Sequence, residues 1–368
     1  MSLTTKGVST IKHIAFSPDS NQLLEVSGAS VRVHNIDSGE QDLRVSGAIL
    51  THGQISPDGR LIAASSSDGH NITLWDKKTG SALSHVSTGS RANSVEFSPD
   101  GKWLVATSES SGLKLWHLDN KSERVVVKFD VSLRTKLQPP TLWQPLSGLR
   151  LALGNNKYIR PVQFSSDNKV ILATGPKNNA SIYDSTTGEL KQLYEGHENS
   201  VTTAQFGPLE KVLITSGNDY RIKKWHVDTG KIISTYNGPK TLPRGTDISP
   251  DGNKIASVWW NDEVWIWSDT GKAITQLNTD HKQRYLSQVS FSADGAQLRL
   301  IGASEVSAWD TRSWEKISTI IATELSDAQV LMGTAENYVL FTDTQGQMEV
   351  VSLDNKQQRL VLKPRIIS

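Results

Sequence analysis

Tryptophan, tyrosine and arginine are the residue types whose pattern in this sequence suggests a functional site. These side chains favour binding of another molecule over catalysis. The stretch "SVWWNDEVWIW" at 257–267 contains four tryptophans within nine residues: Trp259, Trp260, Trp265 and Trp267. An arginine beside such a ring offers cation–π contacts and bidentate recognition of carboxylates. Arg, Tyr and Trp also dominate the binding energy of protein interfaces, at about 2 kcal/mol or more for each desolvated hot-spot residue.

Linear signatures of catalysis are absent from the sequence. It has no G-x-S-x-G elbow, no H-E-x-x-H, no phosphate loop ending in Gly-Lys-Ser or Gly-Lys-Thr, and no G-x-G-x-x-G. It has no cysteine, which excludes disulfides, thiolate zinc sites and a cysteine nucleophile. Neither His117 nor His226, each directly after a tryptophan, makes a metal site by its spacing. We therefore expect no catalytic residue, no metal and no cofactor.

A turn pentapeptide recurs along the chain, as "ISPDG" at 55–59, "FSPDG" at 97–101 and "ISPDG" at 248–252. The residue that precedes each such turn recurs every 39 to 43 residues, apart from one interval of 67: Phe16, Ile55, Phe97, Phe164, Phe206, Ile248 and Phe291. A second landmark follows each one after 18 to 20 residues: His34, Trp75, Trp116, Tyr183, Trp225, Trp267 and Trp309. Two landmarks in one phase indicate a repeated structural unit, with a degenerate eighth copy near Val330.

Each repeat predicts four short antiparallel strands, shown well by residues 201–236. "VTTAQF", "VLITSG", "IKKWHV" and "IISTY" are rich in β-branched and aromatic residues, and Gly, Asp, Asn and Pro fill the gaps. In the pentapeptide, Pro99 presets φ near −65°, Asp100 bonds to local backbone and Gly101 takes a positive φ. One such sheet cannot bury both of its faces alone, so the copies must pack together.

The period near 42, the "FSPDG" turn, the Trp-Asp strand ends at 74–76 and 308–310, and "EGHENSV" at 195–201 resemble the WD-repeat β-propeller family. The resemblance implies an all-β chain that forms a single β-propeller of four-stranded antiparallel blades over residues 1–368. Eight blades are expected, and seven is the alternative. The long interval marks an insertion at about 130–156, either a decorative hairpin or a flap that contacts a partner.

The resemblance also implies a structural tetrad, which links a His before the first strand, a Ser or Thr on the second, an Asp in the next turn and the Trp of the third. Only one unit has all four residues, and we expect them to form one buried hydrogen-bonded chain: His197, Ser216, Asp219 and Trp225.

In the family, the turn between the second and third strands opens onto the top face, and the first strand contributes residues four and six positions before the landmark. Trp259 and Trp260 align with Gly217 and Asn218 in that turn. The expected partner-binding residues are Trp260, Trp259, Arg244, Arg160, Tyr158, Arg91 and Tyr285. The alternative is that the arginines only form a solvated rim.

We therefore expect a non-catalytic protein–protein interaction or scaffold module, monomeric on its own, that binds a protein or peptide with acidic and apolar residues. A small-ligand-binding or hydrolytic propeller that uses the mouth of the central channel is the alternative, because its scattered site would carry no linear motif. A net charge of +1 disfavours nucleic acid. No apolar run reaches the roughly 18 residues of a membrane span. The sequence leaves two alternatives for the compartment: the cytoplasm, or export if a signal peptide has been removed.

Overall fold

The structure is a computed structural model in which the chain divides into two units. The first unit lies within Met1–Ile159 and Glu324–Ser368, and the second within Arg160–Thr323. The structure describes residues 11–28, 30–47, 49–66, 70–89, 92–108, 112–118, 123–127, 162–174, 178–279, 286–302, 305–321, 329–332, 338–342, 348–352 and 359–362. Among these residues the regular structure is β-strand, apart from one short 3₁₀ turn at Pro208–Glu210.

The described part of the first unit forms four-stranded antiparallel sheets in which each strand pairs with its neighbours in sequence. The N-terminal sheets contain β1 (Ile11–Phe16), β2 (Gln22–Ser27), β3 (Ser30–Asn35) and β4 (Gln41–Ser46), then β5 (Leu50–Ile55), β6 (Leu61–Ser66), β7 (Asn71–Asp76) and β8 (Ala82–Ser87). After them come β9 (Ala92–Phe97), β10 (Trp103–Ser108), β11 (Gly112–His117) and β12 (Glu123–Val127). The C-terminal sheet contains β29 (Gln329–Met332), β30 (Tyr338–Thr342), β31 (Met348–Ser352) and β32 (Arg359–Leu362).

The second unit repeats the same pattern over its described residues. Its first two sheets contain β13 (Val162–Phe164), β14 (Val170–Thr174), β15 (Asn179–Asp184) and β16 (Leu190–Glu195), then β17 (Val201–Phe206), β18 (Val212–Gly217), β19 (Arg221–His226) and β20 (Ile232–Asn237). Its last two contain β21 (Pro243–Ile248), β22 (Lys254–Trp259), β23 (Val264–Ser268) and β24 (Ala273–Leu277), then β25 (Gln288–Phe291), β26 (Gln297–Ile301), β27 (Glu305–Asp310) and β28 (Lys316–Ile321).

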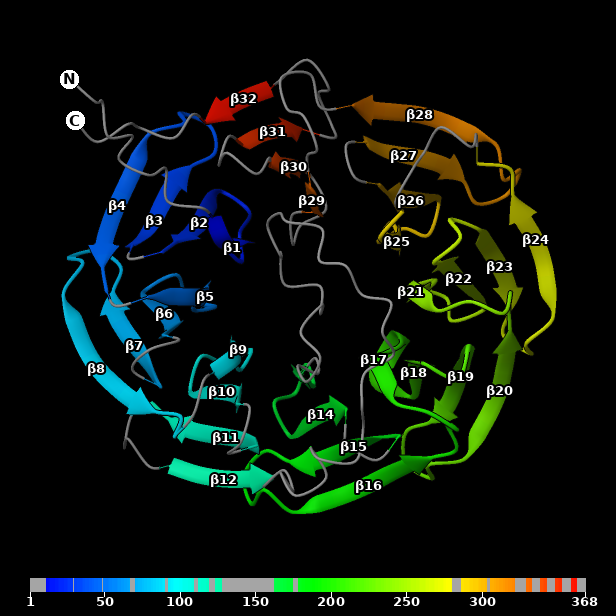
Figure 1. Cartoon of the computed structure of the whole chain (residues 1–368), viewed down its shortest axis with the longest axis horizontal. Coiled ribbons are helices and arrows are strands. Elements are labelled where there is room, and N and C mark those ends of the chain that lie inside the picture. Colours follow the sequence, from blue (N-terminus) through cyan, green and yellow to red (C-terminus); the bar gives the residue numbers. More distant parts are fainter. Residues whose placement is uncertain are drawn as a thin grey trace, which may run out of the picture. The chain divides into compact units, whose positions relative to one another are not determined.

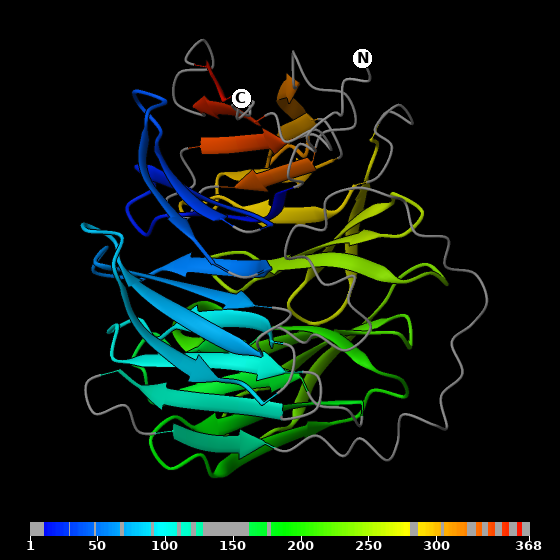
Figure 2. The same ribbon diagram turned by 60° about the vertical axis from the view of Figure 1, so that its left-hand side comes forward.

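Neighbouring sheets of the first unit pack face to face. The first strands contact one another, β1 with β5 and β5 with β9, whereas the fourth strands lie apart (Figure 1). Figure 2 shows the sheets β1–β4, β5–β8 and β9–β12 stacked in that order. Leu24 and Val26 of the first sheet pack with Ile62 and Trp75 of the next. Because both faces of such a sheet are covered, its central strands are almost continuously buried.

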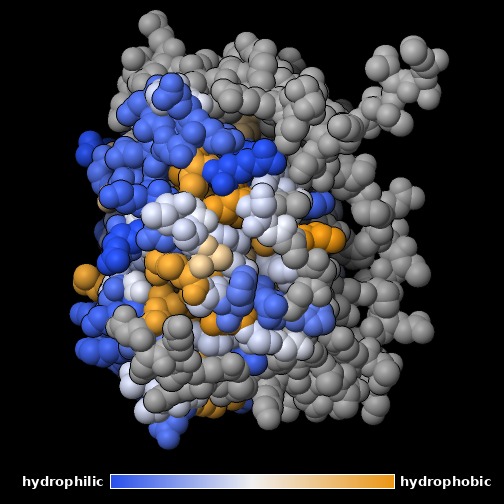
Figure 3. Space-filling view, turned by 90° about the vertical axis from the view of Figure 1, so that its left-hand side faces the viewer, coloured by the Kyte–Doolittle hydropathy of each residue, from blue (hydrophilic) through white to orange (hydrophobic). Residues whose placement is uncertain are grey.

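The N-terminal and C-terminal sheets are also neighbours in this unit. Phe16 and Leu23 share a buried cluster with Leu340 and Val350. The first and last strands, β1 and β32, thus belong to packed sheets, but β1 pairs with β2 and β32 pairs with β31 rather than with each other. The fourth strands β4 and β8 are largely exposed, and the side that carries them shows small apolar areas among hydrophilic ones (Figure 3).

The sheets of the second unit pack in the same way, and the landmark tryptophans of β19, β23 and β27 lie in the core: Trp225, Trp267 and Trp309. Trp225 packs with Leu172 and Tyr194 of the preceding sheet. In the following sheet, Trp267 packs in the same way with Ile214 and Tyr236 of β17–β20. These two landmark tryptophans therefore contact the preceding sheet.

The recurrent turn has the predicted conformation. In "FSPDG", Ser98 Oγ donates to Asp100 Oδ1 at 2.6 Å, and Gly101 has a φ of 70°. The backbone N–H of Trp103 donates back to Ser98 Oγ at 2.9 Å, which closes the loop onto the second strand. A further hydrogen bond joins neighbouring sheets, because the backbone N–H of Phe97 donates to Gln54 Oε1 at 2.9 Å. The turns therefore hold the landmark residues in register between sheets.

The segment near Val330 forms the predicted four-stranded sheet, β29–β32. The number of blades in a closed ring and the single domain over 1–368 stay predictions. The insertion at about 130–156 lies outside the described residues.

Candidate functional site

A buried chain of hydrogen bonds in the sheet β17–β20 joins an indole, a hydroxyl, an imidazole and a carboxylate. Trp225 Nε1 donates to Thr215 Oγ1 at 2.8 Å, and His197 Nε2 lies 2.7 Å from the same oxygen. His197 Nδ1 lies 2.9 Å from Asp219 Oδ1. Burial lowers the pKa of His197, although the hydrogen bond to Asp219 opposes that shift. A neutral imidazole that donates to Asp219 and accepts from Thr215 satisfies every member of the chain.

The hydroxyl in this chain belongs to Thr215, so the prediction of Ser216 was wrong. Leu213 pairs with Trp225 across β18 and β19, and alternation along β18 then places Thr215 on the same face as Trp225. Ser216 points to the opposite face, where its Oγ lies 3.3 Å from Thr246 Oγ1 of the next sheet.

Trp259 is completely buried, with 0% of its surface exposed, so the prediction that it faces a partner was wrong. Its Nε1 donates to Ser257 Oγ at 2.9 Å. Trp267 Nε1 donates to the same oxygen at 2.9 Å. Ser257 in this sheet therefore has the role that Thr215 has in the preceding one, and Trp259 is its second partner.

Two glycines explain why the side chain of Trp259 points inward. Gly217 aligns with Trp259, and a Cβ atom at Gly217 would lie 2.5 Å from His197 Nδ1. The sheet β17–β20 is preceded by Gly196-His197, whereas β21–β24 has Gly238-Pro239 at the same position. A Cβ atom at Gly238 would lie 2.1 Å from Trp259 Cζ2. The indole of Trp259 therefore occupies the place that an imidazole takes in the sheet β17–β20.

Trp260 lies in the turn between β22 and β23 and is 48% exposed. Arg244, on β21, stacks on it with its Cζ atom 4.2 Å from the ring centroid. The same guanidinium donates to Asp262 Oδ1 at 3.1 Å and to the carbonyl oxygen of Leu286 at 2.9 Å. The backbone N–H of Leu286 donates to Asp262 Oδ1 at 3.0 Å. These contacts hold the indole in place at the surface.

The side chain of Arg244 is only 16% exposed, and it stacks on the half-exposed ring of Trp260. A glutamate at this position would face Asp262 and remove a donor from the carbonyl of Leu286. Arg244 therefore holds the indole of Trp260 in position, and its substitution would disturb folding.

Sequence reasoning missed Tyr220, which lies in the corresponding turn between β18 and β19. Its side chain is 47% exposed, and its φ of 62° is in the left-handed region. Asp262, at the same position of the next turn, has the same φ of 62°. Beside Tyr220, Arg221 Nη1 donates to Glu198 Oε1 at 2.5 Å. The signal in the sequence was an aromatic residue inside the turn "NDYR".

The two turns lie at corresponding positions of sheets that pack against each other. They form what we call the turn surface, made of Tyr220, Arg221 and Trp260, with Arg244 behind the indole. Four further residues that the sequence predicted for partner binding lie outside the described residues: Arg160, Tyr158, Arg91 and Tyr285. In the described part of the chain, no three histidine or acidic side chains are grouped as metal ligands.

Comparison with known proteins matches three segments of the chain to a family of repeats. The model of the WD domain, G-beta repeat, matches residues 45–76, 80–117 and 188–226. The chain carries WD repeats. Protein hir1 of Schizosaccharomyces pombe is 26% identical over 227 residues, which cover 55% of this chain and 23% of that protein.

Two other WD-repeat relatives match parts of the chain. The apoptotic protease-activating factor 1 of Danio rerio is 23% identical over 308 residues, 77% of this chain and 24% of the relative. Subunit I of the eukaryotic translation initiation factor 3 of Scheffersomyces stipitis is 28% identical over 106 residues, 29% of this chain and 30% of the relative. The chain thus spans less than a third of the length of these curated relatives.

A solved structure supports the β-propeller fold. The computationally designed Ika8 protein superimposes with a TM-score of 0.69 at 17% identity, over 94% of this chain and 97% of that one. WD repeats of four antiparallel strands are therefore arranged as in a β-propeller. None of the helical residues in the described ranges forms a helix long and apolar enough to cross a membrane.

Proposed function

We propose that this chain is a non-catalytic interaction module that binds a protein segment on the turn surface, with Trp260 and Tyr220 as anchors. The observation that carries the proposal is the exposure of two large aromatic side chains, 48% and 47%, at corresponding turns of adjacent sheets. Each aromatic residue has a small polar counterpart in the other turn: Asn218 corresponds to Trp260, and Asp262 corresponds to Tyr220.

Exposure to solvent limits what either aromatic side chain adds to folding, although Trp260 gains the stacking contact with Arg244. Burial of an indole or a phenol stabilises a fold by removing apolar surface from water, and these two rings keep about half of theirs in solvent. Tyr220 also has a left-handed φ, which costs a bulky residue on the order of 1 kcal/mol. Exposed aromatic side chains in strained turns are typical of binding sites.

The contacts around the two rings indicate the chemistry of the partner. Apolar side chains would cover the exposed parts of the rings, since Trp and Tyr are the usual anchors of interfaces. Arg221 forms an ion pair with Glu198, whose side chain is 70% exposed. Such a surface pair is worth about 0–1 kcal/mol, so an acidic residue of a partner can replace Glu198. The partner segment therefore combines apolar and acidic residues.

The names of the relatives support a role in interactions. One is a subunit of a translation initiation factor, and another is named as an activator of a protease. The first name describes a part of an assembly and the second an action on another protein. Neither name describes catalysis by the matched region.

Selection from a random peptide library tests this proposal. Peptides retained by the wild-type chain should be enriched in apolar and acidic residues and should be lost by the double variant Trp260→Asn, Tyr220→Asn. Ile233→Ala with Ile274→Ala is the matched control, because these residues are equally exposed at 47% each but lie on β20 and β24. Loss of peptides with the control and retention with the double variant would place the binding site elsewhere.

A further inference from the structure

A tyrosine fills the crevice between successive sheets at two places in the second unit. Tyr194 on β16 is fully buried, and its hydroxyl donates to the carbonyl oxygen of Val227 at 2.7 Å. Tyr236 on β20 is also fully buried, and its hydroxyl donates to the carbonyl oxygen of Asp269 at 3.2 Å. In both cases the accepting residue follows the landmark tryptophan of the next sheet by two positions.

The phenol rings of these tyrosines pack edge-on against that tryptophan. The ring centroids of Tyr194 and Trp225 lie 5.8 Å apart at an interplanar angle of 74°. Those of Tyr236 and Trp267 lie 6.0 Å apart at 69°. Edge-to-face geometry at this distance is the favoured arrangement of an aromatic pair. Each crevice therefore offers a phenol an indole wall and a carbonyl acceptor.

In the first unit, Val86 on β8 occupies the position that corresponds to Tyr236 on β20. It pairs with Ile72 on the neighbouring strand, three residues before Trp75, as Tyr236 pairs with Ile222 three residues before Trp225. Where the tyrosines fill the crevice, the smaller side chain of Val86 leaves a pocket of about 200 Å³. Its wall on the next sheet includes the landmark tryptophan, Trp116, and the residue two positions later, Leu118.

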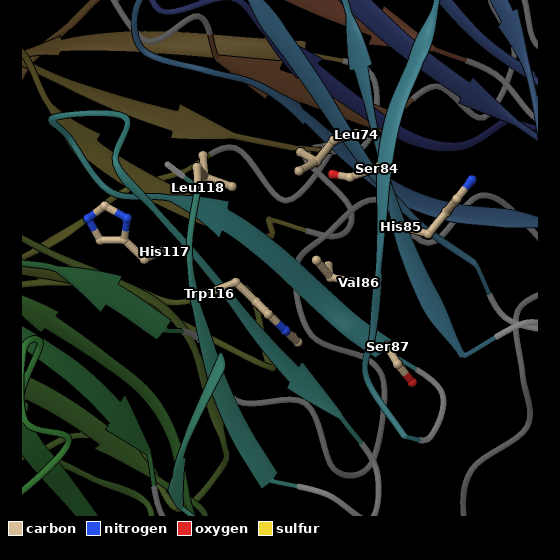
Figure 4. A pocket seen from close by; sticks show the side chains of 8 residues that line it. All are labelled: Leu74, Ser84, His85, Val86, Ser87, Trp116, His117 and Leu118. Atoms are coloured by element: carbon tan, nitrogen blue, oxygen red, sulfur yellow. The ribbon is translucent and has the colours of Figure 1, made fainter. Parts of the chain in front are cut away.

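Figure 4 shows how the side chains around this pocket lie. Ser84 and Val86 on β8 point toward β11, whereas His85 and Ser87 point away from it. From the other side, Trp116 extends toward β8. Leu74, Val86 and Leu118 give the pocket apolar walls, while Ser84 contributes a hydroxyl and Trp116 an indole N–H that has no hydrogen-bond partner among the described residues. For scale, a cavity of about 150 Å³ is known to hold a benzene ring.

We propose that this pocket binds a small phenolic compound, a single ring with one hydroxyl group. The ring would lie against Trp116 and Val86 as the tyrosine rings lie in the second unit, and its hydroxyl would donate to the carbonyl oxygen of Leu118. The occupant is inferred from the chain itself, which places a phenol in the corresponding crevice twice. This site lies in the first unit and does not depend on the turn surface.

Calorimetric titration of the full chain with p-cresol and with toluene tests the proposal. The two compounds differ only in the hydroxyl group, so the hydrogen bond to Leu118 should make p-cresol bind about threefold to tenfold more tightly. Equal affinities, or no saturable binding of p-cresol, would overturn the assignment of a phenol.

Variants at the pocket locate the binding. Val86→Tyr copies the second unit, should fill the crevice with its own ring, and should abolish p-cresol binding. Leu83→Tyr is the control, because Leu83 is exposed on the same strand and should leave binding unchanged. If Val86→Tyr does not fold, Val86→Leu replaces it, since Leu277 stands at the same position of β24, and it should weaken binding. Full binding by a folded Val86 variant would place the compound elsewhere.

A short peptide with a central tyrosine distinguishes a free phenol from a tyrosine of a partner. We expect the dissociation constant of p-cresol to be no higher than that of the peptide. Binding of the peptide without binding of p-cresol would make the crevice a peptide site, and the proposal of a small phenol would be wrong.

Discussion

The sheets β17–β20 and β21–β24 fill one buried position with different side chains. In the first, the indole of Trp225 and the imidazole of His197 meet at the hydroxyl of Thr215. In the second, two indoles, those of Trp267 and Trp259, meet at the hydroxyl of Ser257. The hydroxyl partner of the landmark tryptophan is thus kept, while the residue that fills the remaining space changes from a titratable to an apolar one.

The comparison shows that aromatic residues in adjacent positions of the sequence can have opposite environments. Trp259 is part of the core, although it directly precedes Trp260 at the surface. Each of the following predictions changes one member of this comparison.

The largest effect is expected from Trp259→Ala. The substitution removes a fully buried indole and leaves a cavity at Ser257, so the free energy of unfolding should fall by about 3–5 kcal/mol. Chemical denaturation of the variant beside Trp260→Asn measures this. A loss below about 1 kcal/mol would mean that Trp259 does not fill the place of the imidazole.

A smaller loss is expected from His197→Ala. Asp219 and Thr215 would lose a hydrogen-bond partner in a buried site, at a cost of about 1–3 kcal/mol. Ser216→Ala is the control and should change stability much less than Thr215→Ala, because only Thr215 belongs to the chain. The reverse ranking of these two variants would restore Ser216 to the tetrad.

The two sheets should also differ in their response to acid. The pKa of His197 is lowered by burial from its ordinary 6.5, so the unfolded state binds the proton more readily. The stability that neutral His197 contributes is fully present above pH 6.5 and falls as the pH drops toward the folded pKa. Thermal melts between pH 7 and pH 5 should show a smaller decline for His197→Phe than for the wild type, and an equal decline would contradict this.

A modest gain in stability is expected from adding a hydroxyl to the sheet β9–β12, which lacks one at the position of Thr215. Leu104 pairs with Trp116, which puts Ala106 at the position of Thr215, and Trp116 Nε1 has no hydrogen-bond partner among the described residues. Ala106→Thr should stabilise the first unit by about 1 kcal/mol through a new acceptor for Trp116. Ala106→Val has the same shape without the hydroxyl and should show no such gain in denaturation experiments.

Much of the fold could be predicted from the sequence because turns and alternation are local. The pentapeptide around Pro99 presets its own backbone, and the landmark tryptophans mark the third strands. The error at Ser216 arose because "VLITSG" offers two adjacent hydroxyls and only the register of β18 against β19 separates them. The error at Trp259 arose because an inward side chain requires space, which the absence of a histidine at Pro239 provides. That absence was the available signal.

The turn surface was partly predictable for a different reason. Trp260 stands out in the sequence because a turn rarely contains an indole. The role of Arg244 depends on contacts with Asp262 and Leu286, which come from other parts of the chain and carry no linear motif.

The most direct test of the account is the affinity of one library-selected peptide for the wild type and for Trp260→Asn, Tyr220→Asn, measured by calorimetry beside the melting temperature. Both residues are half exposed, so the substitutions should change the free energy of unfolding by no more than about 1 kcal/mol. The account predicts a loss of affinity of at least about tenfold with a nearly unchanged melt. An unchanged affinity in the folded double variant would contradict it.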